Sequence, residues 1–185
     1  MEFPAVLHST DTICAPATPA GTGAIAVVRI SGPDTQRAVS AFLSDATLPP
    51  SGRLERRFLT APDSGVLLDE AMVVHFVAPA TYTGEDTAEL HLHGSPLLVE
   101  EVLNELSRLG IRHAQPGEFT LRAFLNGKKD LTQAEAVQDL VDASSPGALT
   151  LALGQLTGAV SRALSPLEDQ FLKLLAALES EIDFP

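Results

Sequence analysis

The sequence predicts an α+β protein, in which a mixed β-sheet with packed helices is followed by the first helices of an incomplete α-helical domain. Through the first half, short apolar runs alternate with Pro, Gly and Asp turn residues, a pattern typical of strands and hairpins. Through the last third, apolar residues recur every three or four positions, as in amphipathic helices. With 185 residues, 45% of them hydrophobic, the chain can bury one ordinary core and a second small one.

Five strands are expected in the first half of the chain. "AIAVVRIS" (24–31) is apolar almost throughout, so we expect it to be buried on both faces of the sheet. The segments "RLERRFLTA" (53–61) and "VLLDEAMVVHFVAP" (66–79) flank the turn "PDSG" and predict a hairpin. The other two strands are expected in "DTICAPAT" (11–18) and within "GEDTAELHLHGSP" (84–96).

Two helices are expected among these strands. "SGPDTQRAVSAFL" (31–43) predicts a helix with Pro33 in its first turn and Ser31 or Gly32 near its cap. A second helix is expected from about Pro96 to Leu109, ending at Gly110. Its apolar face is Leu98, Val102, Leu106 and Leu109, and its polar face is Glu101, Glu105 and Arg108.

The remaining chain reads as helix. "LTQAEAVQDLVDA" (131–143) begins with Thr132 and Glu135 at capping-box spacing. Further helix is expected through residues 144–184, interrupted or kinked at Pro166. An apolar seam runs along its last part, formed by Leu164, Leu167, Phe171, Leu174, Leu178 and Ile182. Because this seam reaches the last residues without a polar tail, we expect an incomplete helical domain, with a boundary between domains 1–120 and 121–185.

Composition narrows the class of protein. There is no run of about eighteen apolar residues, so no membrane span is predicted. The opening "MEFPAVLHSTDT" lacks a basic start and an apolar core, so no export signal is expected. A single cysteine, Cys14, rules out an internal disulfide and suits a reducing compartment. We therefore expect a cytoplasmic protein.

Charge is unevenly distributed along the chain. The formal net charge is −12, and residues 130–185 hold nine Asp and Glu against two Lys and Arg. A polyanion such as tRNA would be repelled by that segment alone. Any nucleic acid contact is therefore expected to need other parts of a larger assembly.

Motifs for nucleotide binding are missing from this sequence. It contains no G-x-x-x-x-G-K-S/T phosphate loop. Gly21-Thr22-Gly23 lies between two expected strands rather than before a helix, so it predicts a tight turn and not a dinucleotide site. No nucleotide site is therefore expected in this chain.

Glu89, His91 and His93 occupy alternate positions of one expected strand. The side-chain period of two places all three on the same face. Such a face suits a transition metal, since imidazole and carboxylate are metal ligands. It equally suits the wall of an organic ligand site, or the solvated side of a sheet.

Two cations are further candidates for a binding site. Arg29 interrupts an apolar strand. If it is buried, it needs an anionic partner. If it lies at an edge, its side chain can instead reach water. Lys128 follows the turn Asn126-Gly127, where it could reach an acidic group, although an ordinary surface lysine fits the same pattern.

Four stretches together resemble the tRNA-modification GTPase family called MnmE or TrmE. They are "DTICAPATPAGTGAIAVVRISGP", "YTGEDTAELHLHGSP", "PGEFTLRAFLNGKKDLTQAEAVQDLVDA" and the closing "IDFP". The resemblance covers the chain from about Asp11 to Pro185. It implies the family's N-terminal domain, similar to folate-binding aminomethyltransferase domains, and the first helices of its helical domain, without the G domain.

The resemblance implies a ligand and partners. The N-terminal domain is expected to bind 5-formyl- or 5,10-methylene-tetrahydrofolate through Arg29, Glu89 and Lys128, with His93 as a further candidate, and to form a homodimer. The full protein is expected to work with the flavoprotein MnmG on carbon 5 of the tRNA wobble uridine. GTP, Mg²⁺ and K⁺ would act only through the missing G domain, so this chain is expected to have no GTPase activity alone.

Two alternatives to folate binding stay open. One is a dimerisation or assembly module with an unoccupied pocket. The other is a metal-dependent enzyme that uses Glu89, His91 and His93. No residue is nominated as a catalytic acid, base or nucleophile.

Overall fold

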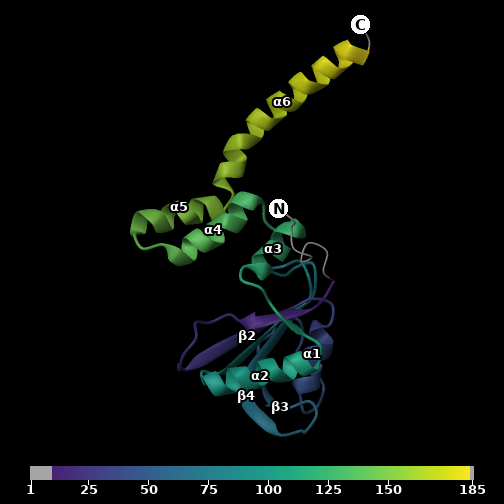
Figure 1. Cartoon of the computed structure of the whole chain (residues 1–185), viewed down its shortest axis with the longest axis vertical. Coiled ribbons are helices and arrows are strands. Elements are labelled where there is room, and N and C mark those ends of the chain that lie inside the picture. The colour runs from purple at the N-terminus through teal and green to yellow at the C-terminus, as the bar shows by residue number, and fades with distance from the viewer. Residues whose placement is uncertain (1–9, 184–185) are drawn as a thin grey trace. The chain divides into compact units, whose positions relative to one another are not determined.

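The computed structural model describes residues 10–183, except the side chains of Glu181 and Asp183, and the chain divides into two units after Lys128 (Figure 1). We call residues up to 128 the sheet unit and residues 129–185 the helical unit. The boundary expected after residue 120 falls inside helix α3 (Glu118–Leu125), and the division after Lys128 keeps this helix whole. Most of the opening segment, and Phe184 and Pro185 of the "IDFP" stretch, lie outside the described residues.

The sheet unit is built on a six-stranded mixed sheet, which confirms the predicted α+β class. Its strand order is β3-β4-β5-β2-β1-β6. Neighbouring strands are antiparallel except β1 and β6, which are parallel. The strands are β1 (Ile13–Pro16), β2 (Ile25–Ser31), β3 (Glu55–Thr60), β4 (Leu67–Phe76), β5 (Thr87–His93) and β6 (Arg112–His113). Sequence reasoning found all of them except the two-residue β6.

Two helices cover one face of this sheet. These are α1 (Thr35–Phe42) and α2 (Pro96–Arg108), and their apolar faces share one core with inward residues of the strands. In β2 the side chains of Val28 and Ile30 are fully buried, whereas Ile25 is 62% exposed. The expectation that β2 is buried on both faces is therefore wrong, because α1 and α2 pack on one face only.

Two helix details differ from the sequence predictions. Helix α1 begins at Thr35 with Asp34 at its N-cap, so Pro33 precedes the helix instead of standing in its first turn. In α2, Glu105 is buried, whereas it was expected on the polar face. One oxygen of its carboxylate pairs with Arg108 one turn later.

Up to residue 183, the last that the structure describes, the helical unit contains the helices α4 (Leu131–Asp142), α5 (Pro146–Leu156) and α6 (Ala159–Asp183). The capping box of α4 is formed by Asp130 and Gln133, so the prediction of Thr132 and Glu135 is wrong by two residues. Helix α6 continues through Pro166. The helical conformation is interrupted instead at Gly158, between α5 and α6, where a φ of +79° suits glycine. Within the described residues no helix is long and apolar enough to cross a membrane.

Candidate functional site

Arg29 and Glu89 form the centre of the candidate site. They are directly opposite each other in the antiparallel pairing of β2 with β5. Side chains at such paired positions point to the same face, here the face that α1 and α2 leave uncovered. Arg29 Nε and Nη2 both donate to Glu89 Oε1, at 3.0 and 2.8 Å. Sequence reasoning named both residues, and the sheet register brings them together.

The second oxygen of Glu89 lies beside His91. The distance from His91 Nε2 to Glu89 Oε2 is 3.1 Å. Burial alone would raise the pKa of the Glu89 carboxyl, but the hydrogen bonds and charges of Arg29 and His91 outweigh it and lower this pKa. Glu89 is therefore an ionised acceptor that holds one cation and one imidazole.

Two aromatic rings face the Arg29 guanidinium. Its central carbon lies 5.5 Å from the ring centre of Tyr82 and 5.9 Å from that of Phe119. Both distances are within the range of cation–π attraction. Tyr82 comes from the loop between β4 and β5, and Phe119 comes from the first turn of α3, so three separate segments meet at Arg29.

Two hollows open beside this group, and Arg29 lines both. The first has a volume of about 380 Å³ and is otherwise lined by Phe119 and residues 15–17 and 114–117. The second has a volume of about 230 Å³ and is otherwise lined by Glu89, Phe76, Thr87 and residues 80–82. Small-molecule sites commonly occupy concave spaces of about 300 Å³ and above, lined by apolar side chains with a few polar groups. The first hollow has this size, and the second, smaller one adjoins the same arginine.

Lys128 lies next to the loop that carries Tyr82. A Cβ atom placed on Gly84 would lie 3.2 Å from Lys128 Cγ, so the lysine stem packs against Gly84. The lysine itself is exposed, and among residues 10–183 its ammonium group forms no ion pair with Glu89. The structure thus places Lys128 beside Gly84, which follows Tyr82 by two residues, and does not join it to the Arg29–Glu89 pair.

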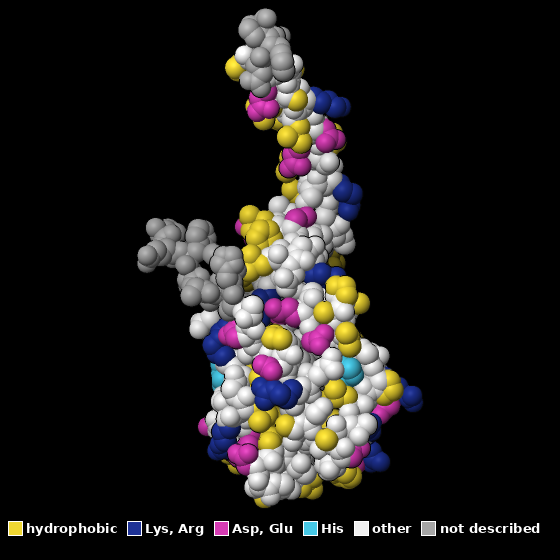
Figure 2. Space-filling view, turned by 90° about the vertical axis from the view of Figure 1, so that its right-hand side faces the viewer, with side chains coloured by type: hydrophobic (Ala, Val, Ile, Leu, Met, Phe, Trp, Pro, Cys, Tyr) yellow, Lys and Arg dark blue, Asp and Glu magenta, His cyan; other side chains and the backbone are white. Residues whose placement is uncertain are grey.

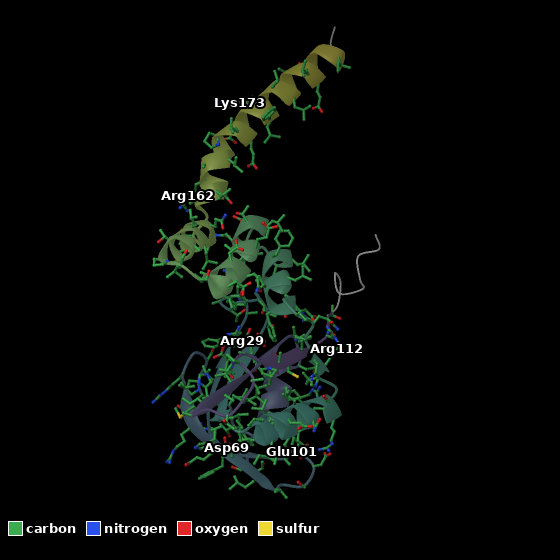
Figure 3. All side chains as sticks on the ribbon, turned by 60° about the vertical axis from the view of Figure 1, so that its left-hand side comes forward. Arg29, Asp69, Glu101, Arg112, Arg162 and Lys173 are labelled. Atoms are coloured by element: carbon green, nitrogen blue, oxygen red, sulfur yellow. The ribbon has the colours of Figure 1, made fainter. Side chains whose placement is uncertain are left out.

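His93 has a different partner from the rest of the predicted face. Its Nδ1 lies 2.6 Å from Asp69 Oδ1, and its side chain is 71% exposed. Figure 3 shows that Asp69 lies well apart from Arg29, towards the opposite end of the sheet. His91, which was not among the predicted folate contacts, is the histidine that contacts Glu89.

This geometry does not support the metal alternative. In the described part of the chain, no group of three His, Cys, Asp or Glu side chains could hold a metal ion. Glu89, His91 and His93 share a face as expected, but His93 is held by Asp69 and Glu89 is held by Arg29.

Sequence reasoning missed the aromatic part of the site. Tyr82 is the only tyrosine of the chain, and it stands in a Thr- and Gly-rich stretch typical of a loop. Phe119 stands at the start of a helix that the sequence analysis did not assign. The sequence pointed to Tyr82 and Phe119 only in that both lie inside stretches that carry the family resemblance.

The fold defines an α+β domain that carries a candidate ligand site and is joined to a helical domain. Residues 12–128 match the family profile described as "GTP-binding protein TrmE N-terminus", and residues 131–185 match the "MnmE helical domain". The chain therefore belongs to the MnmE (TrmE) family.

Relatives named tRNA modification GTPase MnmE agree with this placement. The protein of Opitutus terrae is 47% identical over 95% of this chain, and that of Caulobacter vibrioides is 48% identical over 95%. The protein of Granulibacter bethesdensis is 48% identical over 96%. The aligned region is 38–40% of the length of these relatives, so the chain spans about two fifths of each and corresponds to the N-terminal part.

Proposed function

We propose that this chain is the part of a tRNA-modification GTPase that binds a reduced folate, either 5-formyl- or 5,10-methylene-tetrahydrofolate, as a one-carbon donor. The observation that carries the proposal is the Arg29–Glu89 pair, which lies between two hollows and against two aromatic rings. A folate offers matching groups, namely a polar pterin edge, flat rings and an anionic tail.

Glu89 is the anchor for the pterin. A pterin presents an amino group beside a ring N–H, and a carboxylate can accept from both in parallel. An ionised carboxylate has about four lone-pair positions. Arg29 places both of its hydrogen bonds on Oε1, and His91 contacts Oε2. One position on Oε2 therefore remains, and a pterin edge that donates to both oxygens would have to displace one of the two Arg29 hydrogen bonds on Oε1.

The cations and the aromatic rings supply the other contacts. Arg29 and Lys128 offer positive charge to the carbonyl and carboxylate groups of the ligand. Tyr82 and Phe119 offer faces on which flat rings can stack. His93 would meet only a distant part of the ligand, because it is held by Asp69.

The activity of the whole protein extends beyond this chain. We propose that the domain dimerises, works with the flavoprotein MnmG in the cytoplasm, and supports aminomethyl-type modification of carbon 5 of the wobble uridine of tRNA. GTP, Mg²⁺ and K⁺ would be bound by segments of the relatives that this chain does not span. No residue here is proposed as a catalytic acid, base or nucleophile.

Calorimetric titration with 5-formyl-tetrahydrofolate tests the folate proposal. Glu89→Gln keeps the shape of the side chain but turns one acceptor into a donor facing the pterin N–H groups. We expect a loss of about 1.5–3 kcal/mol of binding free energy, the usual contribution of a hydrogen bond to a charged group. His93→Ala is the matched control and is expected to bind nearly as well as the parent.

The reverse pattern, with unchanged binding by Glu89→Gln and none by His93→Ala, would show that the anchor is assigned wrongly. If the parent itself binds no reduced folate, the assembly-module alternative replaces the folate proposal. That alternative is favoured by the exposed apolar side chains of α6, and sedimentation of the ligand-free chain tests it.

A further inference from the structure

A cluster of five charged side chains lies inside the sheet unit, outside the hollows described above. Its members are Asp11, Glu85, Arg112, Glu118 and Arg122, and we call it the Arg122 cluster. Arg122 Nη2 donates to Asp11 Oδ1 at 2.7 Å and to Glu118 Oε1 at 3.0 Å, and Nη1 lies 3.2 Å from Glu85 Oε2. Arg112 pairs with Asp11 and Glu118 on the outer side.

The cluster is buried at its centre. The side chains of Arg122 and Glu118 are 4% and 0% exposed. Burial alone would raise the pKa of Glu118, but hydrogen bonds from Arg112, Gln115 and Arg122 lower it. The desolvation of buried ions offsets most of the attraction between them, so such a cluster contributes little net stability. Its ion pairs do join segments that lie far apart in the sequence.

Those segments are the two that carry the aromatic rings of the candidate site. Glu85 belongs to the loop with Tyr82, and Glu118 and Arg122 belong to the helix with Phe119. Two further contacts join the same loop and helix region: the Tyr82 hydroxyl lies 2.9 Å from Thr120 Oγ1, and Asn126 Nδ2 donates to the Thr83 carbonyl at 2.7 Å. The loop from Tyr82 to Glu85 is therefore held along α3 at three points.

We propose that Arg122 is a positioning residue for the ligand site, which through Glu85 holds the loop against α3 and so sets Tyr82 and Phe119 beside Arg29. Arg122 is absent from the linings of both hollows, so it acts through the two rings and not on the ligand. The role in folate binding rests on the proposed function. The role in placing Tyr82 does not.

The chain provides its own reporter for this proposal, because it has one tyrosine and no tryptophan. The tyrosine band of the near-ultraviolet circular dichroism spectrum therefore reports the surroundings of Tyr82 alone. Three variants of the 185-residue chain are compared with the parent: Arg122→Lys, Glu85→Gln and the control Arg112→Lys. The control disturbs the same cluster at its outer side, where Arg112 contacts Asp11 and Glu118 but not the loop.

Each variant is measured for thermal unfolding, the tyrosine band without ligand, and affinity for 5-formyl-tetrahydrofolate. We expect Glu85→Gln and Arg122→Lys to weaken the tyrosine band and to lose about tenfold in folate affinity. Arg112→Lys is expected to keep both, although its unfolding temperature falls. Comparison with the parent and with this control therefore distinguishes displacement of Tyr82 from a general loss of stability.

The proposal would be overturned if folded Glu85→Gln kept the tyrosine band of the parent. It would also be overturned if Arg112→Lys lost as much tyrosine band and folate affinity as the other two variants. If Arg122→Lys does not fold, Glu85→Gln decides the question, since its substitution keeps the side-chain shape. If the parent binds no folate, the proposed function fails by itself, and the tyrosine bands of the variants still decide whether Arg122 positions the loop.

Discussion

At the scale of single residues, the Glu89 carboxyl links the candidate site to the pH dependence of stability. Its pKa in the folded chain lies below the ordinary value of 4.5, because hydrogen bonds from Arg29 and His91 outweigh burial. A group whose pKa is lower in the folded state stabilises the fold above its ordinary pKa. This contribution is lost as the pH falls from about 4.5 through the lower folded value.

We therefore expect Glu89→Gln to be less stable than the parent near neutral pH and to approach it in acid. Urea midpoints of both proteins, measured at several pH values from neutral to below 4.5, check this. Glu118, whose pKa is also lowered, stays in both proteins and so does not contribute to the difference. A difference that stays constant across this pH range would show that Glu89 acts by packing and not by charge.

The centre of the candidate site could be predicted from the sequence, and its surroundings could not. Arg29 and Glu89 stand on strands, where the period of two and the need of a partly buried arginine for an anion are local rules. Tyr82 stands on a loop and Phe119 at a helix start, so their meeting at Arg29 depends on tertiary packing. The partner of His93 was equally unpredictable, because it depends on the register between β4 and β5.

At the scale of elements, the turn after β5 depends on close approach of two backbone segments. A Cβ atom on Gly94 would lie 2.3 Å from the Gly23 carbonyl oxygen, whereas one on Gly147 in α5 meets nothing within 4 Å. We expect Gly94→Ala to lower the free energy of unfolding by about 1–3 kcal/mol, because backbone must shift to relieve the overlap. Gly147→Ala is the matched control and should be neutral or slightly stabilising.

Urea unfolding followed by circular dichroism measures both substitutions. Equal stability of Gly94→Ala and the parent would mean that the backbone around Gly23 and Gly94 adapts freely. In that case it could not serve as a fixed end of the β2–β5 pair.

Helix α4 owes its start to one side chain. Asp130 accepts from the backbone N–H of Gln133 and from the hydroxyls of Thr132 and Ser161, at 2.6–2.8 Å. The hydrogen bond from Ser161, followed by that from the Gln133 backbone, lowers the pKa of Asp130. We expect Asp130→Ala to lower the melting temperature of the helical unit, whereas Thr132→Ala, which removes only one donor, should lower it less.

Protection of the first-turn amides of α4, measured by hydrogen exchange, localises this effect. Equal loss of protection in the two variants would restore the sequence prediction, which placed the capping box at Thr132. The comparison thus tests which of two neighbouring polar residues caps the helix.

Elements with a strong periodic pattern could be predicted, whereas the two-residue strand β6 and helix α3 were not. The β3–β4 hairpin and α2 follow from alternation and from apolar spacing. Strand β6 has two residues and exists because Arg112 and His113 pair with β1, which is a long-range contact. The N-cap of α4 was missed because Asp130 and Thr132 both stand at the start of the pattern, and only the geometry selects one.

At the scale of the whole molecule, the apolar seam of α6 has no cover within the described chain. Its six residues, Leu164, Leu167, Phe171, Leu174, Leu178 and Ile182, are each between 47% and 76% exposed. Figure 2 shows hydrophobic side chains along this helix. Burial of a side chain of this size stabilises by about 1.5–3 kcal/mol, so a seam of six favours contact with another chain.

We therefore expect the chain to self-associate through α6 and to do so more weakly when Phe171 and Leu178 are both replaced by Asp. Each carboxylate would have to be desolvated to enter an apolar contact. Sedimentation equilibrium measures the association constant, and Lys173→Glu on the same helix is the control for a change of charge alone. A dimer formed by the sheet unit would survive the double substitution, so the expected result is a reduced association constant and not a complete loss. A parent chain that sediments as a monomer, with α6 fully helical, would show that this seam needs no partner.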